Sequence, residues 1–127
     1  MRWGLTIPFT GIPLADHGDL LRRAEALGYD DLWSAEATGV DGFTPLALAA
    51  AWTERMRLGT AIVNPYTRGL ALLAQSAAAL HDASRGRFVL GLGSSSDVIV
   101  EMERGAVRAA VDAHAGGDRG AAPGARR

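Results

Sequence analysis

Leu58-Gly-Thr-Ala-Ile-Val-Asn-Pro-Tyr-Thr-Arg68 decides the fold, because an apolar run typical of a buried strand leads directly into a polar turn that contains proline. An amide, two hydroxyls and a guanidinium follow one another between Asn64 and Arg68. Parallel α/β barrels present their functional groups at this end of their strands. The stretch therefore predicts a ligand-binding edge. The alternative is a surface turn in which Asn-Pro only ends the strand.

Strand and helix patterns alternate along most of the chain. Strands are expected over residues 2–7, 31–35, 56–63 and 87–93, and helices over 17–27, 44–54 and 69–84. Strands that begin roughly 26 to 31 residues apart, each followed by a helix, favour a parallel sheet with right-handed crossovers. A doubly wound nucleotide-binding sheet has a glycine-rich turn after its first strand, where this chain has Pro8-Phe-Thr-Gly-Ile-Pro13. The predicted fold class is therefore α/β, as the amino-terminal (β/α)4 half of a TIM barrel.

Composition limits the classes of partner. The 127 residues carry 13 basic and 14 acidic side chains, a formal net charge of −1, and no cysteine. Such a chain has no long-range field to gather nucleic acid or an anionic membrane, so neither is expected as a partner. The lack of thiolates and the three scattered histidines predict no metal site. With no signal-peptide pattern at Met1–Pro8, these features predict a cytoplasmic protein.

Residues 102–127 differ in composition from the rest of the chain. Of these 26 residues, 18 are Ala, Gly or Arg, and none is Leu, Ile, Phe, Trp or Tyr. Such a segment cannot bury much apolar surface. We therefore expect a barrel-type domain at 1–101 and an irregular, poorly ordered tail at 102–127, with a short frayed helix over Glu103–His114. A natural tail and out-of-frame translation are both left open.

Two further strand ends carry candidate functional groups. Gly91-Leu-Gly-Ser-Ser-Ser-Asp97 would bring bare backbone and three hydroxyls close to a phosphate or a flavin-type ring, with a tight strand exit as the alternative. Trp33-Ser-Ala-Glu36 places a carboxylate at a strand end, where it could transfer protons. A helix-capping or solvated glutamate is the alternative there. His17, at a helix entrance, is expected to cap the helix or to lie on the surface.

Three segments together carry a family resemblance. They are Gly28-Tyr-Asp-Asp-Leu-Trp-Ser-Ala-Glu36, Leu58–Arg68 and Gly86-Arg-Phe-Val-Leu-Gly-Leu-Gly-Ser94. In this order and spacing they resemble the bacterial luciferase-like superfamily, and in particular its deazaflavin-dependent oxidoreductases. The resemblance covers about residues 1–101 and implies a (β/α)8 barrel, which needs about 250 residues. It also implies the deazaflavin coenzyme F420, which we prefer, or FMN, used for hydride transfer or monooxygenation.

The resemblance also implies roles for individual residues. Ala61 and Ile62 match the non-prolyl cis-peptide bulge that backs the coenzyme ring in this family. Asn64 matches a residue that lines the coenzyme, and Gly93 and Ser94 match contacts beyond the fourth strand. These five residues are the predicted coenzyme-binding set.

Glu36 aligns with an acidic residue after the second strand and is the candidate catalytic residue. Ala37 stands where several relatives carry histidine, so a histidine-based proton transfer is not expected. The predicted function is a flavin- or deazaflavin-dependent oxidoreductase acting on a small molecule. Its activity is expected to be lost or weak in this chain, because half of the barrel is missing. The alternative is a non-catalytic half-barrel that forms a homo-oligomer through exposed sheet edges or docks onto a partner.

Overall fold

The structure is a computed structural model that describes residues 1–36, 39–94, 101, 105 and 108. The chain divides into two compact units, Met1–Ser95 and Ser96–Arg127. All strands and helices discussed below belong to the first unit. The predicted tail and its short helix lie outside the described residues, apart from single positions.

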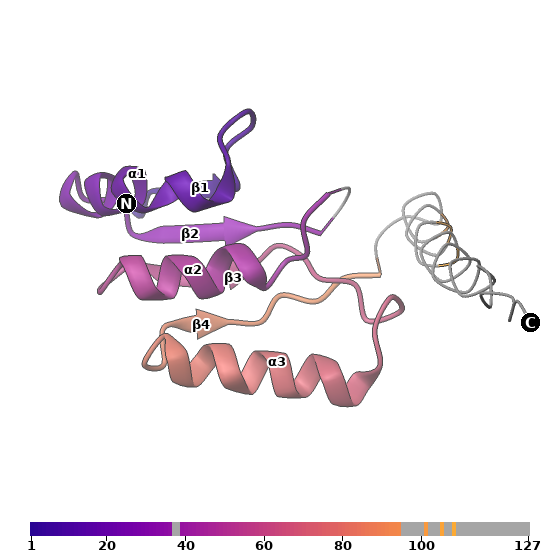
Figure 1. The fold of residues 1–127 in the computed structure, drawn as a ribbon. Helices are drawn as coiled ribbons and strands as arrows, with labels where there is room; N and C mark the ends of the chain where they lie inside the picture. Colours follow the sequence, from indigo (N-terminus) through magenta and orange to yellow (C-terminus); the bar gives the residue numbers. More distant parts are fainter. Residues whose placement is uncertain (37–38, 95–100, 102–104, 106–107, 109–127) are drawn as a thin grey trace, which may run out of the picture. The chain divides into compact units, whose positions relative to one another are not determined.

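A parallel four-stranded sheet with the order β1-β2-β3-β4 forms the first unit. The strands are β1 (Gly4–Ile7), β2 (Asp31–Ser34), β3 (Arg57–Thr60) and β4 (Phe88–Val89). The connecting helices are α1 (His17–Ala26), which follows the 3-10 turn η1 (Leu14–Asp16), α2 (Thr44–Trp52) and α3 (Leu70–Ala83). Strands and helices alternate, and neighbours in the sequence are neighbours in the sheet (Figure 1). The predicted α/β class with parallel strands is confirmed.

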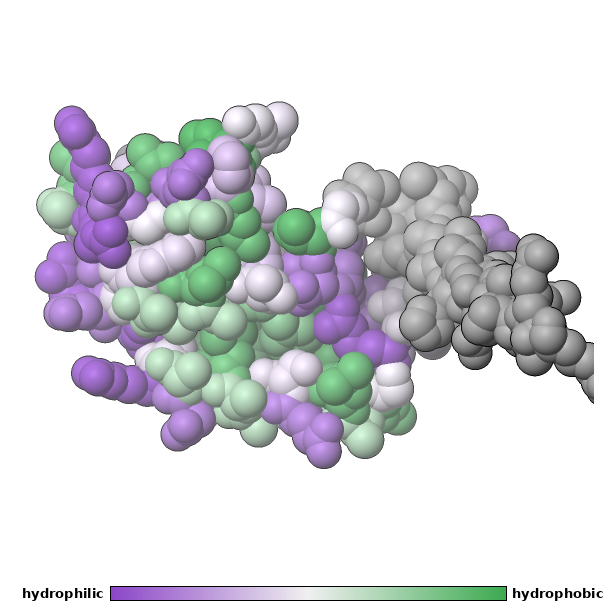
Figure 2. Space-filling view, in the orientation of Figure 1, coloured by the Kyte–Doolittle hydropathy of each residue, from purple (hydrophilic) through white to green (hydrophobic). Residues whose placement is uncertain are grey.

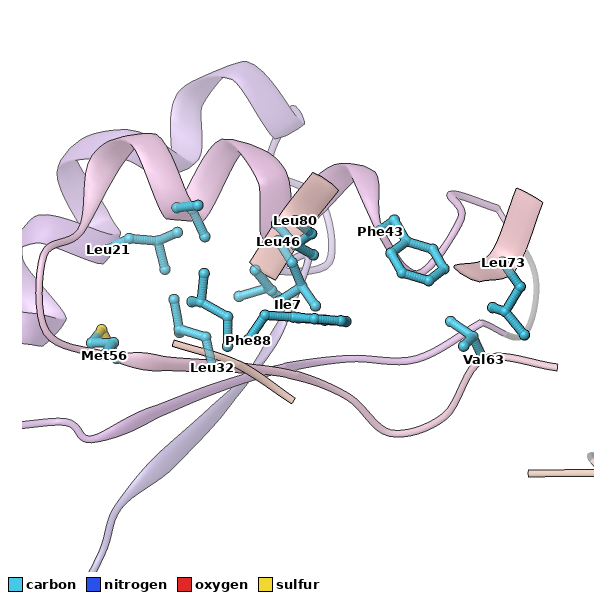
Figure 3. Close-up of a cluster of buried hydrophobic side chains, with 13 residues drawn as sticks. Ile7, Leu21, Leu32, Phe43, Leu46, Met56, Val63, Leu73, Leu80 and Phe88 are labelled. Carbon is cyan, nitrogen blue, oxygen red and sulfur yellow. The ribbon is translucent and has the colours of Figure 1, made fainter. Parts of the chain in front are cut away.

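Apolar side chains on one face of the sheet pack against the helices. Leu32, Leu58 and Phe88 lie opposite one another on β2, β3 and β4. Leu46 of α2 and Leu80 of α3 belong to the same buried cluster. Figure 3 shows Leu32, Phe88, Leu46 and Leu80 of this cluster between the helices and the strands. Burial of a side chain of this size contributes about 1.5–3 kcal/mol, so this layer is the main source of stability for the unit. No helix in the described part of the chain is long and apolar enough to cross a membrane.

Charged side chains hold the end of the sheet where the strands begin. The buried Asp31 carboxylate accepts hydrogen bonds from Arg2 at 2.7 Å and from Arg57 at 2.9 Å. The Glu25 carboxylate of α1 accepts hydrogen bonds from three successive backbone N–H groups, at residues 54–56. In Figure 2 hydrophilic side chains, in purple, gather on the left, where the strands begin. Ion pairs therefore join the strands at this end, and a carboxylate of α1 is hydrogen-bonded to the chain just before β3.

His17 is fully buried, so the expectation of a surface or capping role is wrong. Its Nε2 accepts a hydrogen bond from the Phe9 backbone N–H at 2.8 Å. Nδ1 therefore carries the proton in the neutral ring and donates to the Pro13 carbonyl at 3.0 Å. The ring also stacks on Phe9, with the ring centroids 5.2 Å apart. The histidine fastens the loop after β1, a role that depends on backbone partners and leaves no sequence pattern.

Candidate functional site

β3 and β4 lose their common register at their carboxyl ends. The two strands pair at Gly59 and Val89, and they pair again at Val63 and Leu92. The chain therefore advances four residues on the β3 side and three on the β4 side, which defines a β-bulge. The bulge ends the regular part of β3 at Thr60, sooner than the apolar pattern predicts.

The Thr60 side chain replaces the missing backbone pairing at the bulge. Its hydroxyl donates to the Gly91 carbonyl oxygen at 2.9 Å and accepts from the Gly91 N–H at 2.8 Å. A Cβ atom on Gly91 would lie 2.0 Å from the Thr60 carbonyl oxygen, so only glycine fits here. The bulge contains the Ala61–Ile62 peptide bond, which is cis, as the resemblance implies.

A small open surface lies at the bulge. Ala61 and Ser94 are exposed, and Ile62 and Gly93 are half-buried. A Cβ atom on Gly93 would come within 2.9 Å of the Ile62 side chain, so the glycine allows the close approach. Bare backbone and small exposed side chains at such a surface would suit the flat ring of the coenzyme that the resemblance implies, and contact with it stays a prediction.

Asn64 is more deeply buried than expected for a residue that lines a ligand. It is 1% exposed, and its side-chain oxygen accepts a hydrogen bond from the Tyr66 N–H at 2.8 Å. Its carbonyl oxygen accepts one from the Thr67 hydroxyl at 3.1 Å. Both contacts shape the turn after β3, as is typical of asparagine in turns. Its contact with a coenzyme stays a prediction.

Glu36 lies where the loops after β2 and β3 meet. Its Oε1 accepts hydrogen bonds from the Gly42 N–H at 3.2 Å and from the Arg68 guanidinium, and its Oε2 accepts one from the Asn64 N–H at 3.3 Å. The side chains of Glu36 and Arg68 are only 9% and 16% exposed. The guanidinium also lies 5.1 Å from the centroid of the Phe43 ring. One buried carboxylate thus joins two loops at the carboxyl edge of the sheet.

Asp41 holds the start of α2 beside this ion pair. Its Oδ1 accepts hydrogen bonds from the Phe43 and Thr44 N–H groups at 2.8 and 3.0 Å. Burial acts to raise the pKa of Asp41, but hydrogen bonds with Thr44 and Phe43, together with the charge of Arg68, lower it on balance. Arg68 therefore acts on two carboxylates at this edge.

The face of the sheet opposite the helices carries Trp33. Its indole lies over glycines on both neighbouring strands: a Cβ atom would be 3.1 Å from the ring at Gly4 and 2.3 Å at Gly59. The Arg57 guanidinium is 5.5 Å from the ring centroid, within the range of a cation–π contact. Ala61 comes two residues after Gly59, just past the end of β3. Trp33 thus packs on the strand residue that shortly precedes the bulge.

Sequence reasoning missed two of these contacts. The pairing of Glu36 with Arg68 joins residues 32 positions apart, and Trp33 meets Gly59 across neighbouring strands. The available signal for the ion pair is that both residues follow the carboxyl ends of adjacent parallel strands. The signal for the indole is a glycine at the matching position of the next strand, where a large ring needs space.

The chain matches the luciferase-like monooxygenase family over residues 1–119. It belongs to this family. A Mycobacterium tuberculosis protein, provisionally named as a coenzyme F420-dependent oxidoreductase, is 39% identical to the luciferase-like chain over 102 residues, which make up 80% of this chain and 29% of that protein.

Solved structures show the same fold. The coenzyme F420-dependent tetrahydromethanopterin reductase of Methanopyrus kandleri is similar with a TM-score of 0.69 and 26% identity, over 80% of this chain and 29% of the reductase. The oxygenating constituent of the 3,6-diketocamphane monooxygenase of Pseudomonas putida, in complex with FMN, has a TM-score of 0.66. It is 19% identical over 76% of this chain and 30% of its own. The luciferase-like chain thus spans about a third or less of the length of these relatives, which are oxidoreductases and monooxygenases.

Proposed function

We propose that the luciferase-like chain supplies the surface on which the ring of a reduced deazaflavin or flavin coenzyme rests, in an oxidoreductase that acts on a small molecule. The observation that carries the proposal is the bulge, where exposed Ala61 precedes half-buried Ile62 and the Ile62 side chain lies against Gly93. In α/β barrels the active site is built at this end of the strands. Bound there, the coenzyme would supply hydride transfer, or monooxygenation with oxygen.

Coenzyme F420 is the preferred ligand, and FMN is the alternative. The names of the Mycobacterium tuberculosis and Methanopyrus kandleri relatives support F420. The structure that holds FMN is 19% identical, so it supports the fold alone. In either case Ala61, Ile62 and Gly93 would lie against the ring, and Ser94 would offer a hydroxyl at its rim. Asn64 would affect the coenzyme indirectly, by shaping the turn after β3.

By itself the chain is proposed to hold the coenzyme weakly, with turnover slow or lost. Trp33 is half-buried and Val89 is 41% exposed on the face opposite the helices, so the described residues would cover one side of a ring. Sites for molecules of this size bury most of the ligand surface. We expect a dissociation constant above about 0.1 mM for this chain alone.

Titration of the 15N-labelled chain with oxidised and reduced F420 or FMN tests the proposal. We expect amide shifts confined to residues 61–64 and 93–94. Ala61→Leu, which adds bulk at the bulge, should abolish them, while Ala79→Leu on the exposed surface of α3 should not. Micromolar binding would overturn the claim of weak binding but keep the site. Shifts elsewhere, or none at millimolar coenzyme, would overturn the site.

A non-catalytic half-barrel that pairs with a second copy or another protein is the second candidate. Exposed apolar side chains at β4 and just beyond it favour it: Val89, Leu90 and Leu92 are 41%, 36% and 51% exposed. An edge strand with such side chains is prone to pairing. Sedimentation velocity over a range of concentrations should then show reversible dimers, whereas a monomer at every concentration would count against this candidate.

A further inference from the structure

The backbone of Glu36 and the backbone of the bulge are in direct contact. The Glu36 N–H donates to the Ile62 carbonyl at 3.0 Å, and the Ala61 N–H donates to the Ser34 carbonyl at 2.6 Å. The two ends of the Ala61–Ile62 step are therefore tied to β2 and to the residues that follow it. The Glu36 carboxylate also accepts a hydrogen bond from the Asn64 N–H, in the loop that follows the bulge. Glu36 thus holds the carboxyl side of the bulge through both its backbone and its side chain, and Ser34 holds the other side.

Among the described residues, each group that hydrogen-bonds to the Glu36 carboxylate is a donor. Two are backbone N–H groups and the third is the Arg68 guanidinium. Both carboxylate oxygens thus accept hydrogen bonds from the surrounding loops, an arrangement that suits a group that holds its position.

Burial couples the two charged groups. With both side chains mostly shielded from water, removal of either one leaves the other as a buried and unpaired charge. The exposed ion pair between Asp19 and Arg22 on α1 differs, because its side chains are 94% and 54% exposed. An exposed pair of this kind contributes little to stability. It serves as a matched control for the buried pair.

We propose that Glu36 and Arg68 are positioning residues that set the place of the Ala61–Ile62 bulge, in place of the predicted proton-transfer role for Glu36. The link to a coenzyme rests on the proposed function; the link to the bulge does not. The pair acts on the bulge through the hydrogen bonds to Asn64 and Ile62. A loss of the pair should therefore move the bulge before any ligand is added.

The test compares Glu36→Gln, Arg68→Met and the double variant, with Arg68→Lys as the conservative change and Asp19→Asn with Arg22→Met as the control pair. Without coenzyme, we expect amide exchange at residues 61–64 to speed up about tenfold in each buried-pair variant, and not in the control pair. Amide exchange in the double variant should be little faster than in either single variant, because the two residues act as a unit. Arg68→Lys should restore part of the protection.

Coenzyme affinity supplies the second measurement. If the proposed function holds, the buried-pair variants should weaken binding about tenfold, with Arg68→Lys in between. Unchanged exchange at the bulge in Glu36→Gln and Arg68→Met would overturn the positioning role. The chain could also show the expected faster amide exchange in the buried-pair variants and yet bind no coenzyme. That result would support the positioning role and contradict only the proposed function.

Discussion

The two ends of the sheet each hold a carboxylate between neighbouring strands, but they use it differently. Where the strands begin, Asp31 is held by Arg2 and Arg57 from both sides. Where the strands finish, Glu36 is held by Arg68 and by loop N–H groups. The guanidinium groups are 57% and 43% exposed at the first end and 16% exposed at the second. Water therefore screens the first set of ion pairs far more than the second.

The backbone next to each carboxylate explains the difference. Around Asp31, the pairing of Gly4, Asp31 and Arg57 keeps an unbroken parallel register. The ion pairs there add to a ladder that is already complete. Beyond Thr60 the ladder is interrupted, and side chains supply the missing contacts. The end where the strands begin therefore relies on regular backbone pairing, and the irregular end relies on side-chain contacts.

The largest effect is expected from Gly91→Ala at the irregular end. The new Cβ would lie 2.0 Å from the Thr60 carbonyl oxygen, and that backbone group cannot move without breaking the contact between β3 and β4. We expect a loss of about 3 kcal/mol in the free energy of unfolding, measured by urea denaturation. Gly4→Ala is the control, because its nearest neighbour is the Trp33 side chain at 3.1 Å. Equal losses in both variants would show that the two ends do not differ in this respect.

A smaller loss is expected from Thr60→Val, which removes the hydroxyl and keeps the shape. The Gly91 N–H would lose its partner, while the Gly91 carbonyl would keep the hydrogen bond from the Val63 N–H at 3.1 Å, so we expect a cost of about 2 kcal/mol. Thr60→Ser keeps the hydroxyl and should cost less. The urea midpoint should fall with an unchanged slope. Equal losses of unfolding free energy in Thr60→Val and Thr60→Ser would show that the hydroxyl does not replace the missing backbone pairing.

The smallest effect is expected where the strands begin, at Glu25. Burial acts to raise the pKa of Glu25, but the backbone N–H groups of Arg55, Met56 and Glu54 lower it on balance. A lowered folded-state pKa contributes stability above the unfolded value of about 4.3, and that stability is lost as the pH falls through the folded value. Glu25→Gln should cost about 1 kcal/mol at pH 7 and flatten the acid side of the stability curve.

Thermal or urea unfolding between pH 2 and pH 7 measures this effect. Glu54→Gln is the matched control, because the Glu54 side chain is exposed. A Glu25→Gln protein with the acid dependence of the parent would mean that the three N–H contacts contribute nothing to the folded-state pKa.

Local pattern was enough to predict the order of strands and helices, because each depends on periodicities that span a few residues. α2 begins at Thr44 and α3 covers Leu70–Ala83, close to the predicted ranges. The cis bond at Ala61–Ile62 could be placed only through the family resemblance. The bulge around it could not be placed by pattern, since an apolar run continues through both sides of the broken register.

The sequence by itself determined a parallel α/β unit and the strand ends that carry the candidate coenzyme residues. Only the tertiary structure decided that Glu36 meets Arg68 and that His17 is buried. Only it decided that the Trp33 indole lies over Gly59. The physical reason is that these contacts join groups on different elements, and some of the partners are backbone atoms, which carry no residue signature. A pattern along the chain records which residues face the core, and packing across strands decides which of them meet.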